Sequence, residues 1–269
     1  MTHLTSVRAG CFSMFHSRPL ISVCLPVCDG AAFLAETLDS ILSQSVQDFE
    51  VVVPDDCSTD HSLEIVAKYA RLDRRIKCWR NPRRYGLFAN YNQCIQECSG
   101  LYIKPMAQDD VLLPDMLERC VNVLSSNRNV SLVSTGRTVV DESGLPILSD
   151  VTAETPETLF GRGDVYPGEE VLRACLIPLR NIIGEPCTVM FRWEGARLNF
   201  NEKLSHLGDL ELWLRLLKEG DYSYIPEELV KFRRHQKSAT SRNIAQLRIA
   251  SDIVQLAKLL SPTLADLGC

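Results

Sequence analysis

The feature that most constrains the fold is a regular alternation of short apolar runs and amphipathic segments over the first half of the chain. The apolar runs of strand length are 21–27, 49–54, 76–79 and the run that begins at residue 101. The segments with helical spacing are 32–44, 62–69, 88–97 and 115–125. Uninterrupted apolar runs indicate strands buried on both faces, and their alternation with helices predicts a parallel sheet covered by helices on both sides.

Acidic residues follow the ends of the predicted strands. They are Asp29, Asp55, Asp56, Asp109 and Asp110. A parallel sheet brings the carboxyl ends of its strands to one edge, which is where ligands bind in open α/β sheets. We therefore expect these carboxylates to gather along that edge.

The run LYIKPMAQDDVLLP places the pair Asp109–Asp110 between a strand and a helix. Mg²⁺ prefers one or two carboxylates together with substrate phosphates, so such a pair is a suitable platform for a divalent cation. An acidic turn that caps the following helix is the alternative, and the pair alone favours that alternative.

The second half of the chain is less regular. The sequence predicts strands at 130–140, 181–193 and 221–230, helices at 169–179, 207–218 and 243–260, and a polar loop at 149–168. Such a loop is typical of a segment near a binding site. We divide the chain into a lead-in (1–19), one large domain (20–240) and a C-terminal helical extension (241–269).

Charge and composition disfavour several classes of protein. The 269-residue chain has a formal net charge of −5, which argues against a general nucleic-acid binder. No apolar run approaches the roughly 18 residues that span a bilayer, and the first residues lack the pattern of a secretory signal. The eleven cysteines include no C-x-x-C pair. We therefore expect reduced thiols and a cytoplasmic location, with the inner face of the cell membrane as a further option.

One stretch is markedly basic within this acidic protein. Its cations are Arg71, Arg74, Arg75, Lys77, Arg80, Arg83 and Arg84. Most such runs are solvated faces. Contact with an anionic acceptor or an anionic membrane surface stays open.

Five segments in order carry a family resemblance. They read ISVCLPVCDGAAFLAETLDSILSQSVQDFEVVVPDDCSTDHSLEIV, NYNQCIQECSGLYIKPMAQDDVLLPDMLE, IGEPCTVMFR, GDLELWLRL and FRRHQKSATS. From about residue 21 to 242 the chain resembles the family-2 glycosyltransferases. The resemblance implies the GT-A fold, an α/β fold whose mixed, mostly parallel central sheet is flanked by helices.

The resemblance also implies a reaction, the inverting transfer of a sugar from a nucleoside diphosphate to an acceptor hydroxyl. A divalent metal, Mn²⁺ or Mg²⁺, would neutralise the charge on the leaving diphosphate. Asp109 matches the metal-side carboxylate of the family, flanked by Gln108 and Asp110 in the nucleotide-sugar site. Asp209 matches the general base that takes the proton of the acceptor.

Further positions match the nucleotide pocket of the family. Asp55 matches the acid that hydrogen-bonds the nucleobase. The segment Pro26, Val27 and Cys28 matches the one whose backbone lines the pocket. His235, in RRHQKS, either reaches the diphosphate or the metal, or is a surface histidine.

The sequence departs from the family pattern at three places. Ala107-Gln108-Asp109 occupies the place of the commoner Asp-x-Asp, and Gly208 occupies the place of the acid that usually precedes the base. Cys28-Asp29 stands for Tyr-Asn. No Gln-x-x-Arg-Trp motif of the processive synthases occurs, so the chain is similar to enzymes that add a single sugar.

We therefore expect an inverting glycosyltransferase that uses a UDP- or dTDP-sugar and a saccharide or lipid-linked saccharide acceptor. The expected pathway is synthesis of a bacterial surface polysaccharide. A catalytically impaired nucleotide-sugar-binding or scaffolding protein is the alternative, supported by Ala107 and Gly208. A nucleotidyltransferase is disfavoured because VCDGAAF carries no basic residue. A peripheral membrane contact and a homodimer stay open.

Overall fold

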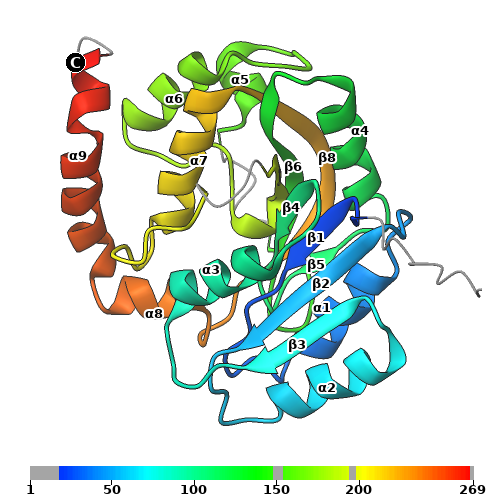
Figure 1. Cartoon of the computed structure of the whole chain (residues 1–269). Coiled ribbons are helices and arrows are strands. Elements are labelled where there is room, and N and C mark those ends of the chain that lie inside the picture. Colours follow the sequence, from blue (N-terminus) through cyan, green and yellow to red (C-terminus); the bar gives the residue numbers. More distant parts are fainter. Residues whose placement is uncertain (1–17, 148–153, 194–197, 267–269) are drawn as a thin grey trace, which may run out of the picture.

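The computed structural model describes residues 18–147, 154–193 and 198–266 (Figure 1). The strands are β1 (Ile21–Cys24), β2 (Phe49–Asp55), β3 (Ile76–Arg80), β4 (Tyr102–Pro105), β5 (Val111–Leu112), β6 (Val130–Val140), β7 (Val189–Arg192) and β8 (Asp221–Arg233). The helices are α1 (Leu34–Leu42), α2 (Ser62–Leu72), α3 (Leu87–Glu97), α4 (Met116–Ser126), α5 (Pro156–Phe160), α6 (Gly168–Leu176), the 3₁₀ helix η2 (Pro186–Thr188), α7 (Gly208–Glu219), α8 (Ala239–Ala245) and α9 (Arg248–Asp266).

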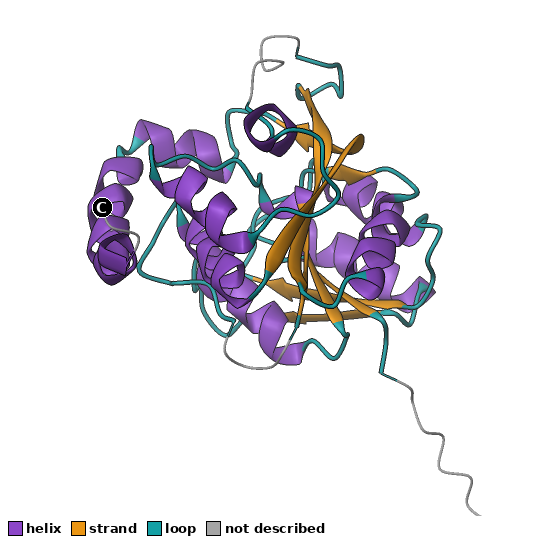
Figure 2. Cartoon of the chain, turned by 90° about the horizontal axis from the view of Figure 1, so that it is seen from above, coloured by secondary structure: helices purple, strands orange, loops and turns teal. Residues whose placement is uncertain are grey.

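The described strands form one eight-stranded sheet in the order β3-β2-β1-β4-β7-β6-β8-β5. Its first half is parallel, and Ile21 of β1 lies opposite Phe49 of β2 on one side and Tyr102 of β4 on the other. In the second half β7 runs antiparallel to both neighbours, and β8 runs parallel to β6. Figure 2 shows helices on both sides of this sheet. The predicted mixed α/β sheet is therefore confirmed.

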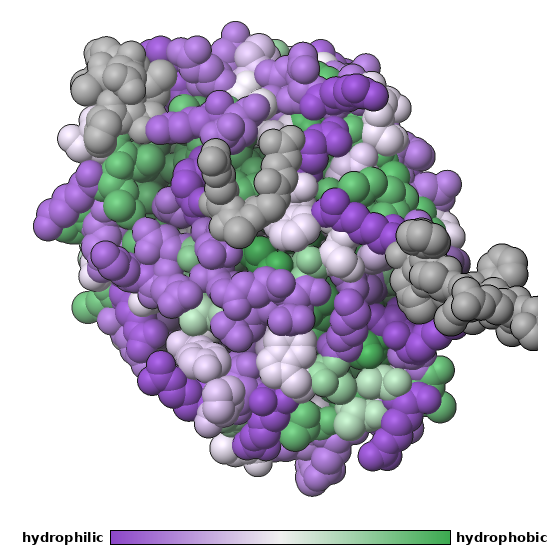
Figure 3. Space-filling view, in the orientation of Figure 1, coloured by the Kyte–Doolittle hydropathy of each residue, from purple (hydrophilic) through white to green (hydrophobic). Residues whose placement is uncertain are grey.

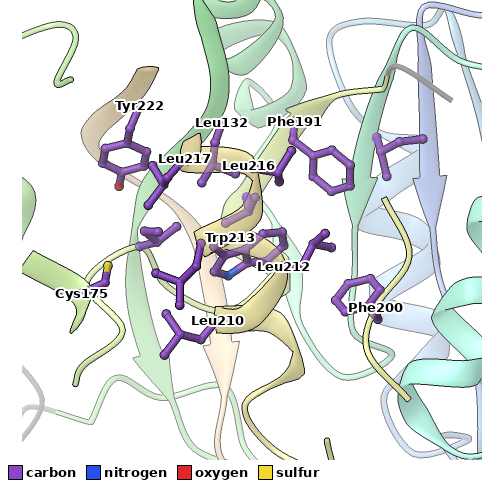
Figure 4. Close-up of a cluster of buried hydrophobic side chains, with 14 of the residues drawn as sticks. Leu132, Cys175, Phe191, Phe200, Leu210, Leu212, Trp213, Leu216, Leu217 and Tyr222 are labelled. Atoms are coloured by element: carbon purple, nitrogen blue, oxygen red, sulfur yellow. The ribbon is translucent and has the colours of Figure 1, made fainter. Parts of the chain in front are cut away.

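Two hydrophobic cores lie on opposite faces of the sheet. Along β1 and β2 the side chains alternate, so that Val23 and Val51 join one core while Cys24 and Val52 join the other. This alternation explains why the strands are apolar throughout. Helix α7 buries its apolar face in the core shown in Figure 4, where Trp213 is fully buried and donates to the carbonyl oxygen of Gly184 at 3.1 Å.

The pairing of β5 with β8 positions the candidate site and was missed from the sequence. β8 extends to Arg233, beyond the predicted end at residue 230, and Val111 pairs with Lys231. A strand of two residues has too short an apolar run to be recognised. As a result the turn that holds Asp109 and Asp110 lies against the end of β8.

Several predicted boundaries were wrong. The helical pattern at 243–260 is two helices, α8 and α9, separated where Leu247 adopts a positive φ of 53°. The predicted loop at 149–168 contains α5, which starts from a capping box at Thr155. Residues 149–153 of that loop, and nearly all of the lead-in 1–19, lie outside the described residues. The predicted strand at 181–193 is confined to β7, because η2 precedes it.

Within the described ranges all nine cysteines are free thiols, and Sγ of Cys24 lies 3.3 Å from Sγ of Cys98. In the same ranges no helix combines the length and the apolar character that a membrane crossing needs. Figure 3 shows a largely hydrophilic face with separate apolar patches.

Candidate active site

Two adjoining pockets occupy the edge of the sheet where the predicted acids lie. The first pocket, of about 570 Å³, is lined by four cations, Arg84, Lys237, Arg242 and Arg248, and by three acids, Asp56, Asp109 and Glu202; we call it the basic pocket. The acidic pocket, of about 830 Å³, is lined by six carboxyl groups, Asp109, Asp110, Asp141, Glu142, Glu185 and Asp209. Asp109 lines both pockets. It therefore marks the place where the two pockets meet.

Asp109 and Asp110 have different surroundings although they are adjacent. Asp110 is buried, and its Oδ1 accepts the backbone N–H of Arg233 at 2.8 Å. Burial and the neighbouring Asp109 raise the pKa of Asp110 well above its usual range. Asp109 instead keeps 18% of its side chain exposed. Asp110 thus anchors the turn, and Asp109 is the carboxylate available to a ligand.

Arg233, at the end of β8, fixes this turn and was not recognised from the sequence. Its guanidinium is almost fully buried and donates to the carbonyl oxygens of Asp109 (3.0 Å), Asp141 (3.2 Å) and Glu142 (3.1 Å). It also pairs with Glu36 at 2.6 Å. An arginine can serve so many acceptors because its donors point in several fixed directions. The signal for this role was an arginine at the end of a long strand, which sequence alone does not distinguish from a surface cation.

His235 lies beside Asp109. Its Nε2 is 2.8 Å from Oδ2 of Asp109, and its ring centroid lies 4.9 Å from that of Phe33. Only 10% of the side chain is exposed, so the interpretation as a surface histidine is wrong. The two side chains present one carboxylate oxygen and one imidazole nitrogen at the junction of the pockets.

Gln108 is engaged by the backbone of Cys28. Its Oε1 accepts the N–H of Cys28 at 2.8 Å, and its Nε2 donates to the carbonyl oxygen of the same residue at 3.0 Å. A Cβ on Gly30 would lie 2.4 Å from this amide, so the turn after β1 requires a glycine there. Gln108 therefore joins the turn after β1 to the turn after β4.

The two acids at the end of β2, Asp55 and Asp56, differ in their hydrogen bonds. Asp56 accepts the backbone N–H groups of Tyr85 (2.7 Å) and Gly86 (2.8 Å), so it holds the loop before α3. Asp55 accepts one N–H, from Ser58 at 3.1 Å. Within the described part of the chain its buried Oδ1 has no hydrogen-bond partner. A buried acceptor of this kind is costly unless a ligand or water satisfies it.

The segment Pro26, Val27 and Cys28 follows β1 and lies partly at the basic pocket. Pro26 and Cys28 line the basic pocket, whereas Val27 is fully buried in the core. The carbonyl oxygen of Val27 accepts the N–H of Asp56 at 2.7 Å. Burial raises the pKa of Cys28 to about 11, so its side chain is a thiol at neutral pH. Asp29 is held by Thr59 and Arg84, and the N–H of Thr59 lowers the pKa of Asp29.

Asp209 is in the first turn of α7 and lines the acidic pocket with Asp109. Its Oδ1 accepts the N–H of Leu210 at 2.8 Å. Burial raises the pKa of Asp209 to about 7, and Glu185 adds to the effect. A carboxyl group with such a pKa can accept a proton near neutral pH.

A steric contact explains why the residue before Asp209 is a glycine. A Cβ on Gly208 would lie 2.5 Å from the ring of Phe88. Phe88, on α3, therefore occupies the space where an acidic side chain would have to start. Glu211 is largely buried and pairs with Arg215 at 2.9 Å, so it is structural.

Lys104 is a second buried cation that the sequence did not reveal. It is fully buried on β4 and donates to the carbonyl oxygens of Pro105 (2.6 Å) and Cys187 (2.7 Å). Burial lowers its pKa to about 8. Its bonds join the strand before Asp109 to η2.

Comparison with known proteins assigns the family. The model of Glycosyl transferase family 2 matches residues 22–170. The chain is 30% identical over 231 residues to EpsE of Bacillus subtilis, which is named as a glycosyltransferase, with 85% of this chain and 78% of the relative covered. It is 28% identical to TuaG of the same organism, named for teichuronic acid biosynthesis, with 85% and 84% covered.

Two solved structures share the fold. TarS 1-349 of S. aureus, in complex with UDP-GlcNAc, has a TM-score of 0.65 at 18% identity, over 82% of this chain and 60% of that chain. The mannosyltransferase PcManGT of Pyrobaculum calidifontis, in complex with GDP-Man and Mn²⁺, has a TM-score of 0.62 at 20% identity, over 91% and 65%. At these identities the likeness concerns the fold alone.

Proposed function

This chain belongs to glycosyl transferase family 2, and from that premise we propose that it is an inverting enzyme that transfers a sugar from a nucleoside diphosphate to an acceptor hydroxyl. The observation that carries the proposal is the position of Asp109 where the basic and the acidic pocket meet. The four cations of the basic pocket suit a diphosphate. The acidic pocket, with Asp209, suits a hydroxyl that must lose its proton.

In this proposal Asp209 is the general base. The oxygen of the acceptor forms a bond to the anomeric carbon while the bond from that carbon to the diphosphate breaks. Asp209 takes the proton of the acceptor hydroxyl, which its pKa of about 7 allows in the neutral range. One displacement of this kind inverts the anomeric configuration.

The residues at the junction fit a divalent metal ion. In the described residues no group of three or more His, Cys, Asp or Glu side chains forms a complete metal site. Mg²⁺ and Mn²⁺ sites in such enzymes commonly use one or two carboxylates and complete the shell with substrate phosphates. Asp109 would supply the carboxylate, and His235 either orients it or adds a nitrogen ligand. A bound metal would neutralise negative charge on the departing diphosphate.

Asp55 lines neither pocket, but its buried Oδ1 has no hydrogen-bond partner within the described residues, and this supports a UDP- or dTDP-sugar as donor. Uracil and thymine each carry one ring N–H, which a buried carboxylate oxygen can accept. Pro26 and Cys28 of the basic pocket would lie along the nucleotide. Gln108 would act on the donor indirectly, because the backbone of Cys28 occupies its amide. Asp110 would hold the turn through Oδ1, whereas its buried Oδ2 has no hydrogen-bond partner within the described residues.

The acceptor we propose is a saccharide or lipid-linked saccharide of a bacterial surface polysaccharide. The relative TuaG, named for teichuronic acid biosynthesis, supports this class. We place the domain boundary as predicted, with residues 20–240 as the glycosyltransferase domain. The proposed setting is the cytoplasm, at the inner face of the membrane where a lipid-linked acceptor would be reached.

A binding or scaffolding protein without catalysis is the second candidate. Ala107, which replaces the first acid of the family motif, is the observation that favours it. Gly208 no longer supports it, since Phe88 fills the space beside it.

A panel of UDP-, dTDP- and GDP-sugars with Mn²⁺ separates the two candidates. Thermal stabilisation reports binding, and release of free nucleotide reports turnover. The proposal predicts that UDP or dTDP donors both stabilise the protein and are slowly hydrolysed. Stabilisation with neither hydrolysis of the donor nor transfer to an acceptor supports the binding protein instead.

A further inference from the structure

The C-terminal helix α9 holds the segment that leads into α7. Asp252 of α9 is buried, and its Oδ2 accepts the backbone N–H groups of Ser205 (2.9 Å), His206 (2.6 Å) and Leu207 (2.9 Å). A carboxylate that receives three N–H donors fixes their positions relative to its own helix. The segment it fixes ends two residues before Asp209.

Helix α8 holds the same segment from a second point. Asn243 is buried and donates to the carbonyl oxygen of Ser205 at 2.7 Å. Farther along α9, Leu256 is fully buried in the core that also contains Leu210. The two C-terminal helices therefore hydrogen-bond the segment before α7, and Leu256 of α9 belongs to the core that α7 also enters.

The N-cap residue of helix α7 supplies no side-chain cap. Leu207 is its N-cap residue, and no side chain there accepts a hydrogen bond. Asp252 supplies a carboxylate at this end from another helix, where negative charge is favoured. The start of α7 consequently depends on a residue far away in the sequence, and the family model, which ends at residue 170, does not extend to it.

We propose that Asp252 is a positioning residue for the transfer step, and that it directs Asp209 into the acidic pocket by fixing residues 205–207. This inference rests on the proposed role of Asp209 as the base. It makes the C-terminal helices a part of the active site, where the sequence predicted an extension. The lining of the pockets supports this view, because Arg242 and Asn243 of α8 line the basic pocket.

Because Asp252 is charged, its removal should change the pH dependence of transfer, which the loss of a purely structural contact would not do. Asp252 and Glu185 both raise the pKa of Asp209 by charge repulsion. The other titratable or charged groups that line the acidic pocket are Asp109, Asp110, Asp141, Glu142, His206, Arg233, Arg234 and His235. Removal of the Asp252 charge alone should therefore move the ionisation of Asp209 to lower pH.

The test compares Asp252→Asn with Glu170→Gln, which removes one exposed carboxylate on α6, away from both pockets. For Asp252→Asn we expect kcat for transfer to fall about 10- to 100-fold, because a displaced general base reacts slowly. The KM of the donor should stay within about twofold of wild type, and the acidic limb of the pH profile should move to lower pH. Glu170→Gln should match wild type in all three.

Asn243→Ala keeps the charge of Asp252 and removes the bond to Ser205, together with a longer contact of 3.5 Å from Arg248. We expect it to lower kcat without a shift of the pH limb. Thermal unfolding of each variant identifies any loss of folding, and if Asp252→Asn does not fold, Asn243→Ala decides. Wild-type kcat in the folded variants would overturn the positioning role.

The two proposals fail in different ways. If Asp209→Asn retains transfer, the base assignment is wrong and the inference about Asp252 falls with it. If Asp209→Asn abolishes transfer while Asp252→Asn keeps the wild-type kcat and pH limb, only the inference about Asp252 is overturned.

Discussion

Nε2 of His235 lies 2.8 Å from Oδ2 of Asp109, at the junction of the basic and acidic pockets. Two segments that are far apart in the sequence meet here, because β5 pairs with β8 and brings the turn after β4 to the end of β8. The contact gives Asp109 a fixed orientation. If Asp109 holds a metal as proposed, the contact links metal affinity to the C-terminal part of the chain.

His235→Ala should weaken the metal-dependent part of UDP binding about 10- to 100-fold, as is usual when a partner of a metal-side carboxylate is lost. Calorimetry of UDP with Mn²⁺ and with a chelator measures this part. His61→Ala, which changes an exposed histidine paired with Glu64, is the control and should have no effect. If UDP affinity fell equally with Mn²⁺ and with the chelator, His235 would not act through a metal.

The activity should rise with pH through about 7, because Asp209 must be ionised to accept a proton and its pKa is raised to about 7. A profile of kcat between pH 5 and 9 measures this limb. A flat profile across pH 6 to 8 would contradict the assignment.

The ionisation of Asp209 should lower stability as the pH rises, whereas it should raise activity. The pKa of Asp209 is higher in the folded protein than its ordinary value of 3.8, so the folded state binds this proton more tightly than the unfolded state. Its contribution to the free energy of unfolding is complete below about pH 4 and is lost as the pH rises through about 7. Urea unfolding of wild type and Asp209→Asn at pH 5.5 and 8 should give a smaller pH dependence for the variant. Identical pH dependences would contradict the raised pKa.

Gly208→Ala should destabilise the protein by about 1–3 kcal/mol, since its Cβ would overlap the ring of Phe88 and force a shift of α3 or α7. Transfer should fall as well, because Asp209 moves with the start of α7. Gly163→Ala is the matched control, because its Cβ meets Tyr166 at an ordinary 3.5 Å. Denaturant unfolding gives both free energies. A Gly208→Ala variant as stable as wild type would mean that Phe88 can move aside.

Arg233→Lys should lower the free energy of unfolding by about 2 kcal/mol or more, because an ammonium group cannot reach all the acceptors of the guanidinium and leaves buried ones unpaired. Donor affinity should fall with it, since the Asp109–Asp110 turn loses its support. Arg128→Lys, at an exposed position on the surface, is the control. If both variants unfold alike, Arg233 does not support the turn.

The parallel half of the sheet could be predicted from the sequence, since its strands are continuous apolar runs and its acids follow the strand ends. The C-terminal half could not be predicted as well. Its pairing uses the two-residue strand β5, and the cited bonds of Arg233 and Asp252 join residues 124 and 46 positions apart. Nothing in the local pattern around these two residues indicates burial, so contacts of this kind become visible only in the folded chain.

The sequence also grouped acids that the structure separates. Asp109 and Asp110 are adjacent, yet the N–H of Arg233 engages Asp110 while Asp109 lines both pockets. Asp55 and Asp56 divide in the same way, because backbone N–H groups before α3 occupy Asp56. Neighbours on a turn point in different directions, and spacing alone does not tell which one meets a ligand.

The most direct test of the account is a comparison of Asp209→Asn with wild type in both UDP binding and sugar transfer, with Mn²⁺ present. Because Asp209 lines the acidic pocket and not the basic one, we predict unchanged UDP affinity and a loss of transfer of at least about a hundredfold, the lower range for removal of a general base. Transfer at the wild-type rate, with UDP affinity intact, would contradict the assignment of Asp209 as the base.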